Sequence, residues 1–178
     1  LAVGQIDSLN HISIVMSDYS EDKVYIYDDK GSLISLLYYP TFFNGITGLA
    51  IGDVDNDGNG EIIIADAVED TIISYSHTGG ITGRITIPLG KDDGMIVGDV
   101  IGDEKEEIII ASDKHDTIYV YDNNGTLLQS FNYRYDNGDG LAAGNMILTW
   151  PIDKEEIILG GPRGNDITIL RSDGLELD

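Results

Sequence analysis

The chain repeats one short sequence pattern four times, and this repetition limits the folds open to it. Residues 1–7, Leu-Ala-Val-Gly-Gln-Ile-Asp, return as Leu-Ala-Ile-Gly-Asp-Val-Asp from residue 49, as Met-Ile-Val-Gly-Asp-Val-Ile from residue 95 and as Leu-Ala-Ala-Gly-Asn-Met-Ile from residue 141. The copies are therefore 48, 46 and 46 residues apart. A fixed period in this range is typical of repeat architectures in which each unit is one supersecondary motif. We expect four units, at about residues 1–48, 49–94, 95–140 and 141–178.

Each unit has the pattern of four short β-strands. In the second unit these are residues 48–52, 61–65, 71–75 and 83–87, which are rich in β-branched side chains and separated by Gly, Asp, Asn and Pro. No stretch keeps the 3.6-residue apolar period of an amphipathic helix over a helix-length window. Four antiparallel strands in about 46 residues form a propeller blade. The predicted fold is therefore all-β, a β-propeller of four-stranded antiparallel blades over residues 1–178, with an incomplete last blade.

Glycines occur at two recurring places in the units. One ends the short apolar first strand of each unit, which suits an inner strand where backbones approach closely. The other lies between the third and fourth strands, where a tight hairpin needs a left-handed backbone conformation. These hairpin glycines are Gly31, Gly79, Gly125 and Gly174. The third hairpin also contains the glycosylation sequon Asn124-Gly-Thr126, although Asn-Gly is equally the dipeptide that such turns prefer.

The composition argues against several classes of function and of site. The chain has 32 acidic and 10 basic residues and a net charge of −22, which argues against nucleic-acid binding because that needs a basic face. It contains no cysteine, so disulfides and thiolate metal sites are excluded. No apolar run approaches the roughly 18 residues of a membrane span. Because the chain begins inside a repeat and not with methionine, we expect a processed form or a segment of a longer propeller.

One acidic loop has the spacing of a calcium site. Asp53, Asp55, Asp57 and Glu61 occupy positions 1, 3, 5 and 9 of a nine-residue loop, with glycine at position 6. Calcium takes about six to eight hard oxygen ligands, and alternate residues of a tight loop converge on one point. The backbone carbonyl of Asn59, at position 7, adds one more oxygen. Without a cation, each close carboxylate pair repels by roughly 1 kcal/mol in water and about 4 at an intermediate dielectric.

The equivalent loops of the other units are less complete. Asp99, Asp103 and Glu107 keep the register in the third unit, but position 3 is isoleucine and position 6 is not glycine, so we expect a weaker second site at best. The first and fourth loops differ in length, and we expect both to be structural connections without metal. Their polar residues are Gln5, Asp7 and His11 in the first, and Asn145, Asp153 and Glu156 in the fourth.

The chain resembles the FG-GAP or VCBS repeats of integrin-α-type β-propellers. The resemblance is most specific over residues 49–65, where a Gly-ended strand precedes Asp-x-Asp-x-Asp-Gly-x-x-Glu and an apolar strand, and weaker copies extend it over essentially the whole chain. It implies Ca²⁺ in the loop between the first and second strands of the blade, and an extracellular setting. It implies as ligands Asp53, Asp55, Asp57, the Asn59 carbonyl and Glu61. The phenylalanine-glycine pair of the family is missing from the unit starts, and family propellers have more blades than four.

These features favour a calcium-stabilised, non-catalytic extracellular or cell-surface module that binds a protein or glycan through one propeller face. One alternative is an architectural subunit of a surface layer or filament, which self-associates through the open C-terminal blade. Another is a polysaccharide-active enzyme, although the few basic residues are scattered along the chain. Aromatic residues near the connections between units are candidates for a ligand-facing surface: Tyr38, Tyr39, Phe42, Phe43, Tyr133 and Tyr135.

Overall fold

The computed structural model describes residues 1–7, 11–18, 20–38, 46–136, 138–146, 154–161 and 166–177. The fold in this part of the chain is all-β, with no helix among the described residues. Tyr39, Phe42, Phe43 and Asp153 lie outside it. The strands are β1 (Ala2–Gln5), β2 (Ile12–Asp18), β3 (Lys23–Asp28), β4 (Leu33–Tyr38), β5 (Ile46–Gly52), β6 (Glu61–Asp66), β7 (Thr71–Tyr75), β8 (Ile81–Thr86), β9 (Gly94–Gly98), β10 (Glu107–Ser112), β11 (Thr117–Tyr121), β12 (Leu127–Asn132), β13 (Gly140–Gly144), β14 (Glu156–Gly160) and β15 (Ile167–Leu170).

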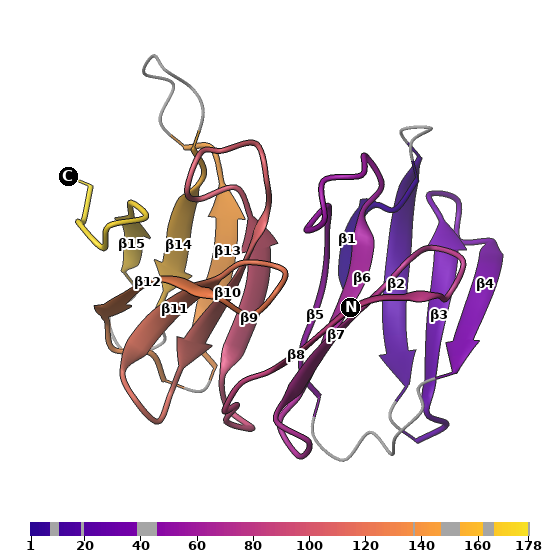
Figure 1. The fold of residues 1–178 in the computed structure, drawn as a ribbon, viewed down its shortest axis with the longest axis horizontal. Helices are drawn as coiled ribbons and strands as arrows, with labels where there is room; N and C mark the ends of the chain where they lie inside the picture. The colour runs from indigo at the N-terminus through magenta and orange to yellow at the C-terminus, as the bar shows by residue number, and fades with distance from the viewer. Residues whose placement is uncertain are drawn as a thin grey trace.

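The strands form four antiparallel sheets in chain order, as blades of a propeller (Figure 1). Blade 1 contains β1–β4, blade 2 contains β5–β8, blade 3 contains β9–β12 and blade 4 contains β13–β15. The prediction of an incomplete last blade is confirmed for the described residues, because only an isolated bridge between Leu170 and Glu176 stands where a fourth strand would pair with β15. No described residue belongs to a helix long and apolar enough to cross a membrane.

The hydrophobic core lies between the blades. The side chains of a strand alternate between the two faces of its sheet. The uninterrupted apolar runs of β6 and β10 therefore pack against the blades on both sides. Val15 and Ile26 of blade 1 pack with Ile62 and Ile64 of blade 2, while Ile63 faces blade 3. A third cluster joins blades 3 and 4. Each inner blade is therefore held by apolar burial on both of its faces.

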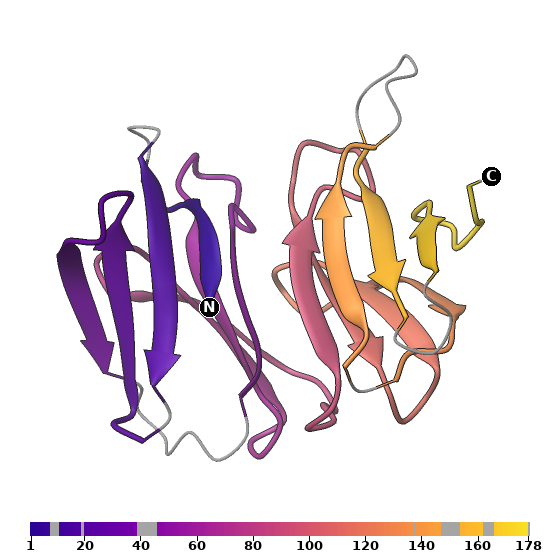
Figure 2. The ribbon, with the colours of Figure 1, turned by 180° about the vertical axis from the view of Figure 1, so that it is seen from behind.

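The first strand of each blade is the inner strand, and the inner strands pack side by side. β1 lies next to β5, β5 next to β9 and β9 next to β13 (Figures 1 and 2). Gly52, at the end of β5, has no room for a side chain, because a Cβ atom there would collide with Val97 and Glu106 of blade 3. The prediction of a crowded inner strand is confirmed at this position.

The turns adopt the left-handed backbone that their residues permit. All four hairpin glycines have positive φ angles, from 79° to 87°. The turns that lead into β3, β7 and β11 also use this region, at Asp22, Asp70 and Asp116 with φ of 53°, 50° and 47°. Aspartate enters this region more readily than most residues other than glycine.

Candidate metal centre

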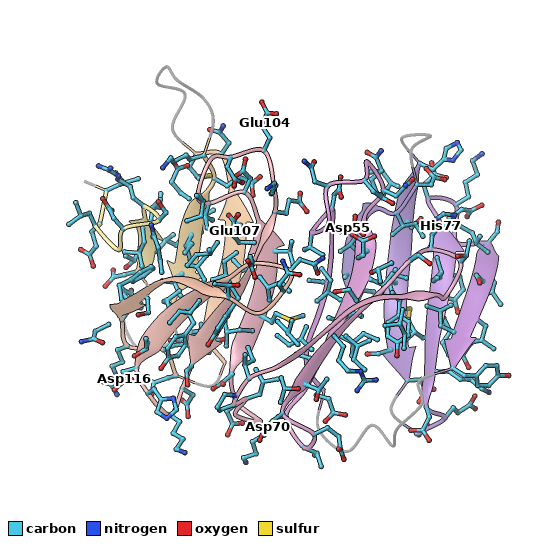
Figure 3. The ribbon with its side chains drawn as sticks, viewed as in Figure 1. Asp55, Asp70, His77, Glu104, Glu107 and Asp116 are labelled. Carbon is cyan, nitrogen blue, oxygen red and sulfur yellow. The ribbon has the colours of Figure 1, made fainter. Side chains whose placement is uncertain are left out.

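The acidic loop of blade 2 connects two strand ends that are paired with each other. Gly52 at the end of β5 pairs with Glu61 at the start of β6, so the loop leaves the sheet and returns to the same place. Asp53 directly follows Gly52, and the first and last acidic residues of the motif are therefore brought together by the register. The loop lies at the end of the blades that also carries the β9–β10 loop (Figure 3).

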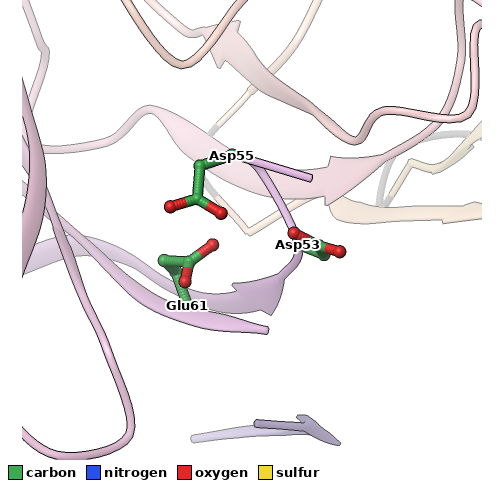
Figure 4. Close-up of side chains that lie close together, drawn as sticks. All are labelled: Asp53, Asp55 and Glu61. Atoms are coloured by element: carbon green, nitrogen blue, oxygen red, sulfur yellow. The ribbon is translucent and has the colours of Figure 1, made fainter. Parts of the chain in front are cut away.

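Three of the predicted ligands converge. Carboxylate oxygens of Asp53, Asp55 and Glu61 all lie within 4.8 Å of one another. Figure 4 shows the carboxylates of Asp55 and Glu61 facing each other, with Asp53 beside them. Asp55 is exposed, whereas Glu61 is only 1% exposed and lies at the base of the cluster. The group of carboxylate oxygens is therefore enclosed on the side of Glu61 and open to solvent on the side of Asp55.

Asp57 and Asn59 are not part of this convergent group. The backbone N–H of Asp57 donates to Asp53 Oδ1 at 3.0 Å and to Asp55 Oδ1 at 3.2 Å. The Asp57 carboxylate accepts from the backbone and side-chain N–H groups of Asn59, at 2.8 and 2.9 Å. The loop is thus closed by its own side chains, and the ligand roles of Asp57 and Asn59 stay predictions.

Glu61 carries a carboxylate oxygen without a partner. Its Oε2 atom is buried and has no hydrogen-bond partner in the described part of the chain. Burial, and then the negative charges of Asp55, Asp57 and Asp53, together raise the pKa of Glu61 to about 7. Burial, and then the charge of Asp57, also raises the pKa of Asp55. A divalent cation would remove both the cost of the unpartnered oxygen and the repulsion between the carboxylates. It would ligate that oxygen and neutralise the negative charges.

The β9–β10 loop of blade 3 has the same conformation despite its different sequence. Asp99 accepts from the backbone N–H groups of Asp103 and Glu104 at 3.2 and 3.0 Å, as Asp53 accepts from Asp57 and Gly58. Positive φ angles occur at positions 4 and 6 in both loops. They are 60° and 87° at Asn56 and Gly58, and 83° and 67° at Gly102 and Glu104. Glu104 therefore adopts the backbone that glycine supplies in blade 2.

The second cluster uses positions 1, 5 and 9 of its loop, whereas the first uses positions 1, 3 and 9. Asp99, Asp103 and Glu107 bring carboxylate oxygens within 4.8 Å of one another. Burial, and to a smaller extent the charges of Asp99 and Asp103, raise the pKa of Glu107 to about 7. Glu107 Oε2, however, already accepts from the backbone N–H of Ile101 at 3.0 Å. Because Ile101 stands where Asp55 stands in blade 2, this loop has no carboxylate at position 3. It also has no orphan oxygen of the Glu61 kind among its described atoms.

The corresponding connections of blades 1 and 4 differ from these two loops in the residues that they bring together. In blade 1, Asp7 Oδ2 lies 3.2 Å from His11 Nδ1, and the position of Glu61 is taken by Ser13, which pairs with Gly4. In blade 4, Glu156 pairs with Gly144 and accepts from the backbone N–H of Met146 at 2.7 Å. The absence of metal from these two connections stays a prediction.

Sequence reasoning missed one residue next to the centre. Glu106 of blade 3 accepts from the backbone N–H of Asp53 at 2.7 Å, across the junction between two blades. Burial raises its pKa, and the charges of Glu155 and Asp53 act in the same direction. No local motif marks Glu106, because its partner is 53 residues away. It braces the first residue of the loop from the neighbouring blade.

The predicted aromatic surface is only partly present. Tyr38 is 70% exposed, Tyr133 is half-buried and Tyr135 is buried, with its hydroxyl donating to the carbonyl of Asp139 at 3.3 Å. Asn124 is exposed in its hairpin, where its backbone N–H donates to Asp122 Oδ1 at 2.9 Å. Its turn geometry agrees with the hairpin interpretation of the Asn-Gly dipeptide.

Comparison with solved structures supports the propeller fold. The Vibrio cholerae biofilm matrix protein Bap1 matches 98% of this chain with a TM-score of 0.58 and 23% identity, over 27% of its own chain. Virginiamycin B lyase from Staphylococcus aureus matches 99% of this chain with a TM-score of 0.65 and 14% identity, over 53% of its own. BBS1N, solved in complex with ARL6DN, matches 88% with a TM-score of 0.57 and 15% identity, over 46% of its own.

This chain thus spans between about a quarter and about half of the chains it resembles. No protein-family model matches it, and no curated protein matches it either.

Proposed function

We propose that this chain is a calcium-stabilised, non-catalytic binding module of the cell surface or extracellular space, built from FG-GAP or VCBS-type repeats. The observation that carries the proposal is the buried, unpartnered Oε2 of Glu61 within reach of Asp53 and Asp55. A carboxylate oxygen buried without a partner destabilises the folded protein, so its placement favours a site built for a cation. Hard oxygens in a flexible loop favour Ca²⁺.

The proposed role of the ion is structural. The loop joins the inner strand to the second strand of blade 2, and its first residue is hydrogen-bonded to Glu106 of blade 3. An ion held by Asp53, Asp55, Asp57, the Asn59 carbonyl and Glu61 would fix this connection and the blade junction beside it. The Asp99, Asp103 and Glu107 cluster is proposed as a second, weaker site.

The proposed ligand is a protein or glycan that contacts the end of the blades carrying the metal loops. This end has a hollow of about 470 Å³ between blades 1 and 2, whose polar lining includes His11, Asp28, Lys30 and His77. Loops at one end of a scaffold are common binding surfaces. Two of the proteins with a similar fold are named as a biofilm matrix protein and as BBS1N in complex with ARL6DN. The former supports an extracellular location.

Thermal unfolding tests the calcium site. The chelated protein is titrated with CaCl₂, and the same titration is run on Asp55→Asn. A ligand at about 100 times its dissociation constant stabilises the folded state by about 2.7 kcal/mol. In a chain of this size we expect the Tm to rise by roughly 5–10 °C, and this rise to be largely lost in the variant.

Exposed Asp29, in the β3–β4 hairpin, provides the matched control. Asp29→Asn removes the same charge and should keep the full response to calcium. No rise in wild-type Tm, or an equal rise in Asp55→Asn, would contradict the proposal. For the ligand, glycan-array binding of wild type is compared with His77→Ala; loss of a calcium-dependent signal supports the proposed face, and unchanged binding rejects it.

A further inference from the structure

Two consecutive glutamates at the start of β10 contact two different acidic loops, which lie at the same end of the blades (Figure 3). Glu107 accepts, through Oε2, from the backbone N–H of Ile101 in the β9–β10 loop of its own blade, at 3.0 Å. Glu106 accepts, also through Oε2, from the backbone N–H of Asp53 in the β5–β6 loop of blade 2, at 2.7 Å. A single peptide unit therefore connects the two loops.

The direction of the Glu106 side chain follows from the alternation along β10. Ile108 and Ile110 pack in the cluster between blades 2 and 3, whereas Ile109 and Ala111 pack in the cluster between blades 3 and 4. Because successive side chains of a strand point to opposite faces, Glu106 falls on the blade 2 side with the first pair. The contact with Asp53 is thus fixed by the strand and not by a mobile side chain.

Glycines at the ends of the inner strands leave room for this contact. A Cβ on Gly52 would collide with the carboxylate of Glu106. The same arrangement recurs at the next junction, where a Cβ on Gly98 would collide with the carboxylate of Glu155 in blade 4. The backbone N–H of Glu155 also donates to the carbonyl of Asp99, at 2.8 Å. Each loop with a convergent acidic cluster is therefore held by a glutamate of the following blade.

The junction between blades 1 and 2 is built differently. Gly60 precedes Glu61 as Glu106 precedes Glu107, and a Cβ on Gly60 would collide with the backbone carbonyl of Gln5. A side chain that could reach into the blade 1 loop is therefore excluded at this position. The glutamate contact accompanies the two acidic clusters and is missing from the loop of blade 1, for which no metal is predicted.

We propose that Glu106 is a positioning residue that couples the two acidic loops, so that calcium in one increases the calcium affinity of the other. The coupling rests on the proposed function, because it requires both loops to bind calcium. An ion in the β5–β6 loop would fix Asp53, and the hydrogen bond from Asp53 would then fix Glu106 and the adjoining Glu107. Part of the ordering that the second ion requires would be complete before it binds. By linkage, the effect is the same in both directions.

Charge alone acts in the opposite direction. The first calcium ion makes the surroundings of the second loop less negative, and so reduces their attraction for another cation. This effect is screened over about 8 Å at 0.15 M ionic strength, whereas a hydrogen-bonded connection is not screened in this way. An increase in affinity would therefore identify the Glu106 contact and not the shared acidic surface.

A double-mutant cycle followed by NMR tests the coupling. The backbone amide of Gly58 reports calcium in the β5–β6 loop, and that of Glu104 reports calcium in the β9–β10 loop. In 0.15 M NaCl, we expect Asp55→Asn, which removes a ligand from the first loop, to weaken calcium binding at the second loop roughly fivefold. In the Glu106→Ala background, Asp55→Asn should not weaken it, because the connection is already lost.

Two control variants separate positioning from charge and from loss of a side chain. Glu106→Gln should keep most of the coupling, because its amide oxygen still accepts from the Asp53 N–H without the negative charge. Glu155→Ala removes the corresponding carboxylate at the next junction and should keep the dependence on Asp55. Hydrogen exchange in EDTA adds a measurement that needs no calcium: the Asp53 amide should exchange faster in Glu106→Ala and near the wild-type rate in Glu106→Gln.

The outcomes distinguish the coupling from the metal centre itself. If neither Gly58 nor Glu104 responds to calcium, the proposed function fails and the coupling fails with it. If both respond but Asp55→Asn leaves the affinity of the β9–β10 loop unchanged or higher, the metal sites stand and only the coupling is overturned. A response of Gly58 alone, or the same weakening with and without Glu106, would also overturn it. Equal behaviour of Glu106→Gln and Glu106→Ala would assign the effect to charge and reject positioning.

Discussion

Glu61 combines burial with a cluster of like charges, and this combination predicts how pH acts on the calcium-free protein. The raised pKa of about 7 means that the folded state holds a proton that the unfolded state releases near 4.5. Stability therefore falls as pH rises between these values and stays low above them. The proposed calcium ion would reverse this pH dependence, because it would bind the deprotonated carboxylates.

The pH prediction is measured by denaturant unfolding between pH 4.5 and 8. In EDTA, we expect the free energy of unfolding of wild type to decrease with pH more steeply than that of Glu61→Gln, which cannot lose this proton. With calcium, stability should increase over the same range. Glu69→Gln, at an exposed position, serves as the control and should follow wild type. Parallel curves for wild type and Glu61→Gln in EDTA would be inconsistent with the raised pKa.

Glu104 shows a backbone preference overridden by the loop around it. Its φ of 67° is unfavourable for a residue with a Cβ, by roughly 1–2 kcal/mol. Glu104→Gly should therefore stabilise the calcium-free protein by about 1 kcal/mol, after the greater flexibility of glycine in the unfolded chain is subtracted. Lys105→Gly, at the next residue, has no positive φ to relieve and should destabilise it. Chemical denaturation of both variants measures the difference, and equal effects would argue against strain.

At the scale of elements, the β5–β6 and β9–β10 loops share a backbone conformation but differ in the positions of their acidic side chains. Their positive φ positions and Asp-centred hydrogen bonds coincide, and both end on a buried glutamate paired with a glycine. The principal difference is at position 3, where Asp55 is replaced by Ile101. Ile101 packs partly against the cluster between blades 3 and 4. Affinity at such sites depends on the number of charged ligands, so the missing carboxylate at position 3 predicts weaker calcium binding at the β9–β10 loop.

This comparison predicts a gain of function. Ile101→Asp should add the missing carboxylate at position 3 to those of Asp99, Asp103 and Glu107, and tighten calcium binding at the β9–β10 loop by roughly tenfold or more. Without calcium, the variant should be destabilised by about 1 kcal/mol, because apolar contact is lost and a charge is added. Isothermal titration calorimetry measures the stoichiometry and affinity. Ile101→Ala loses the packing without adding a ligand, and a similar gain in that variant would refute the explanation.

At the scale of the whole molecule, the net charge of −22 opposes the compact state. Because the core lies between blades, this repulsion acts across the same junctions that the apolar clusters hold together. Salt shortens the screening length from about 30 Å at 0.01 M to about 10 Å at 0.1 M. The calcium-free protein is therefore the form most sensitive to ionic strength.

We accordingly expect the Tm in EDTA to rise by several degrees between 0.01 and 0.5 M NaCl. The rise should be smaller with saturating calcium, which neutralises the densest carboxylate cluster. Sucrose at matched osmolarity controls for effects unrelated to screening. A Tm that is independent of NaCl, or equally sensitive with and without calcium, would show that charge repulsion contributes little.

The sequence by itself determined the blade architecture and the local chemistry. Strand β7 has the predicted bounds, residues 71–75, because apolar alternation and turn residues act over a few positions. The hairpin glycines were predictable for the same reason, as were the acidic loops. The incomplete fourth blade followed from the shortened last repeat.

Tertiary structure decided what depends on distant residues. The orphan oxygen of Glu61, the contact of Glu106 with Asp53 and the left-handed Glu104 all arise where blades meet or where a loop is closed by its strands. Burial is a property of neighbours in space, and a repeating sequence alone does not state which side chains a neighbouring blade covers.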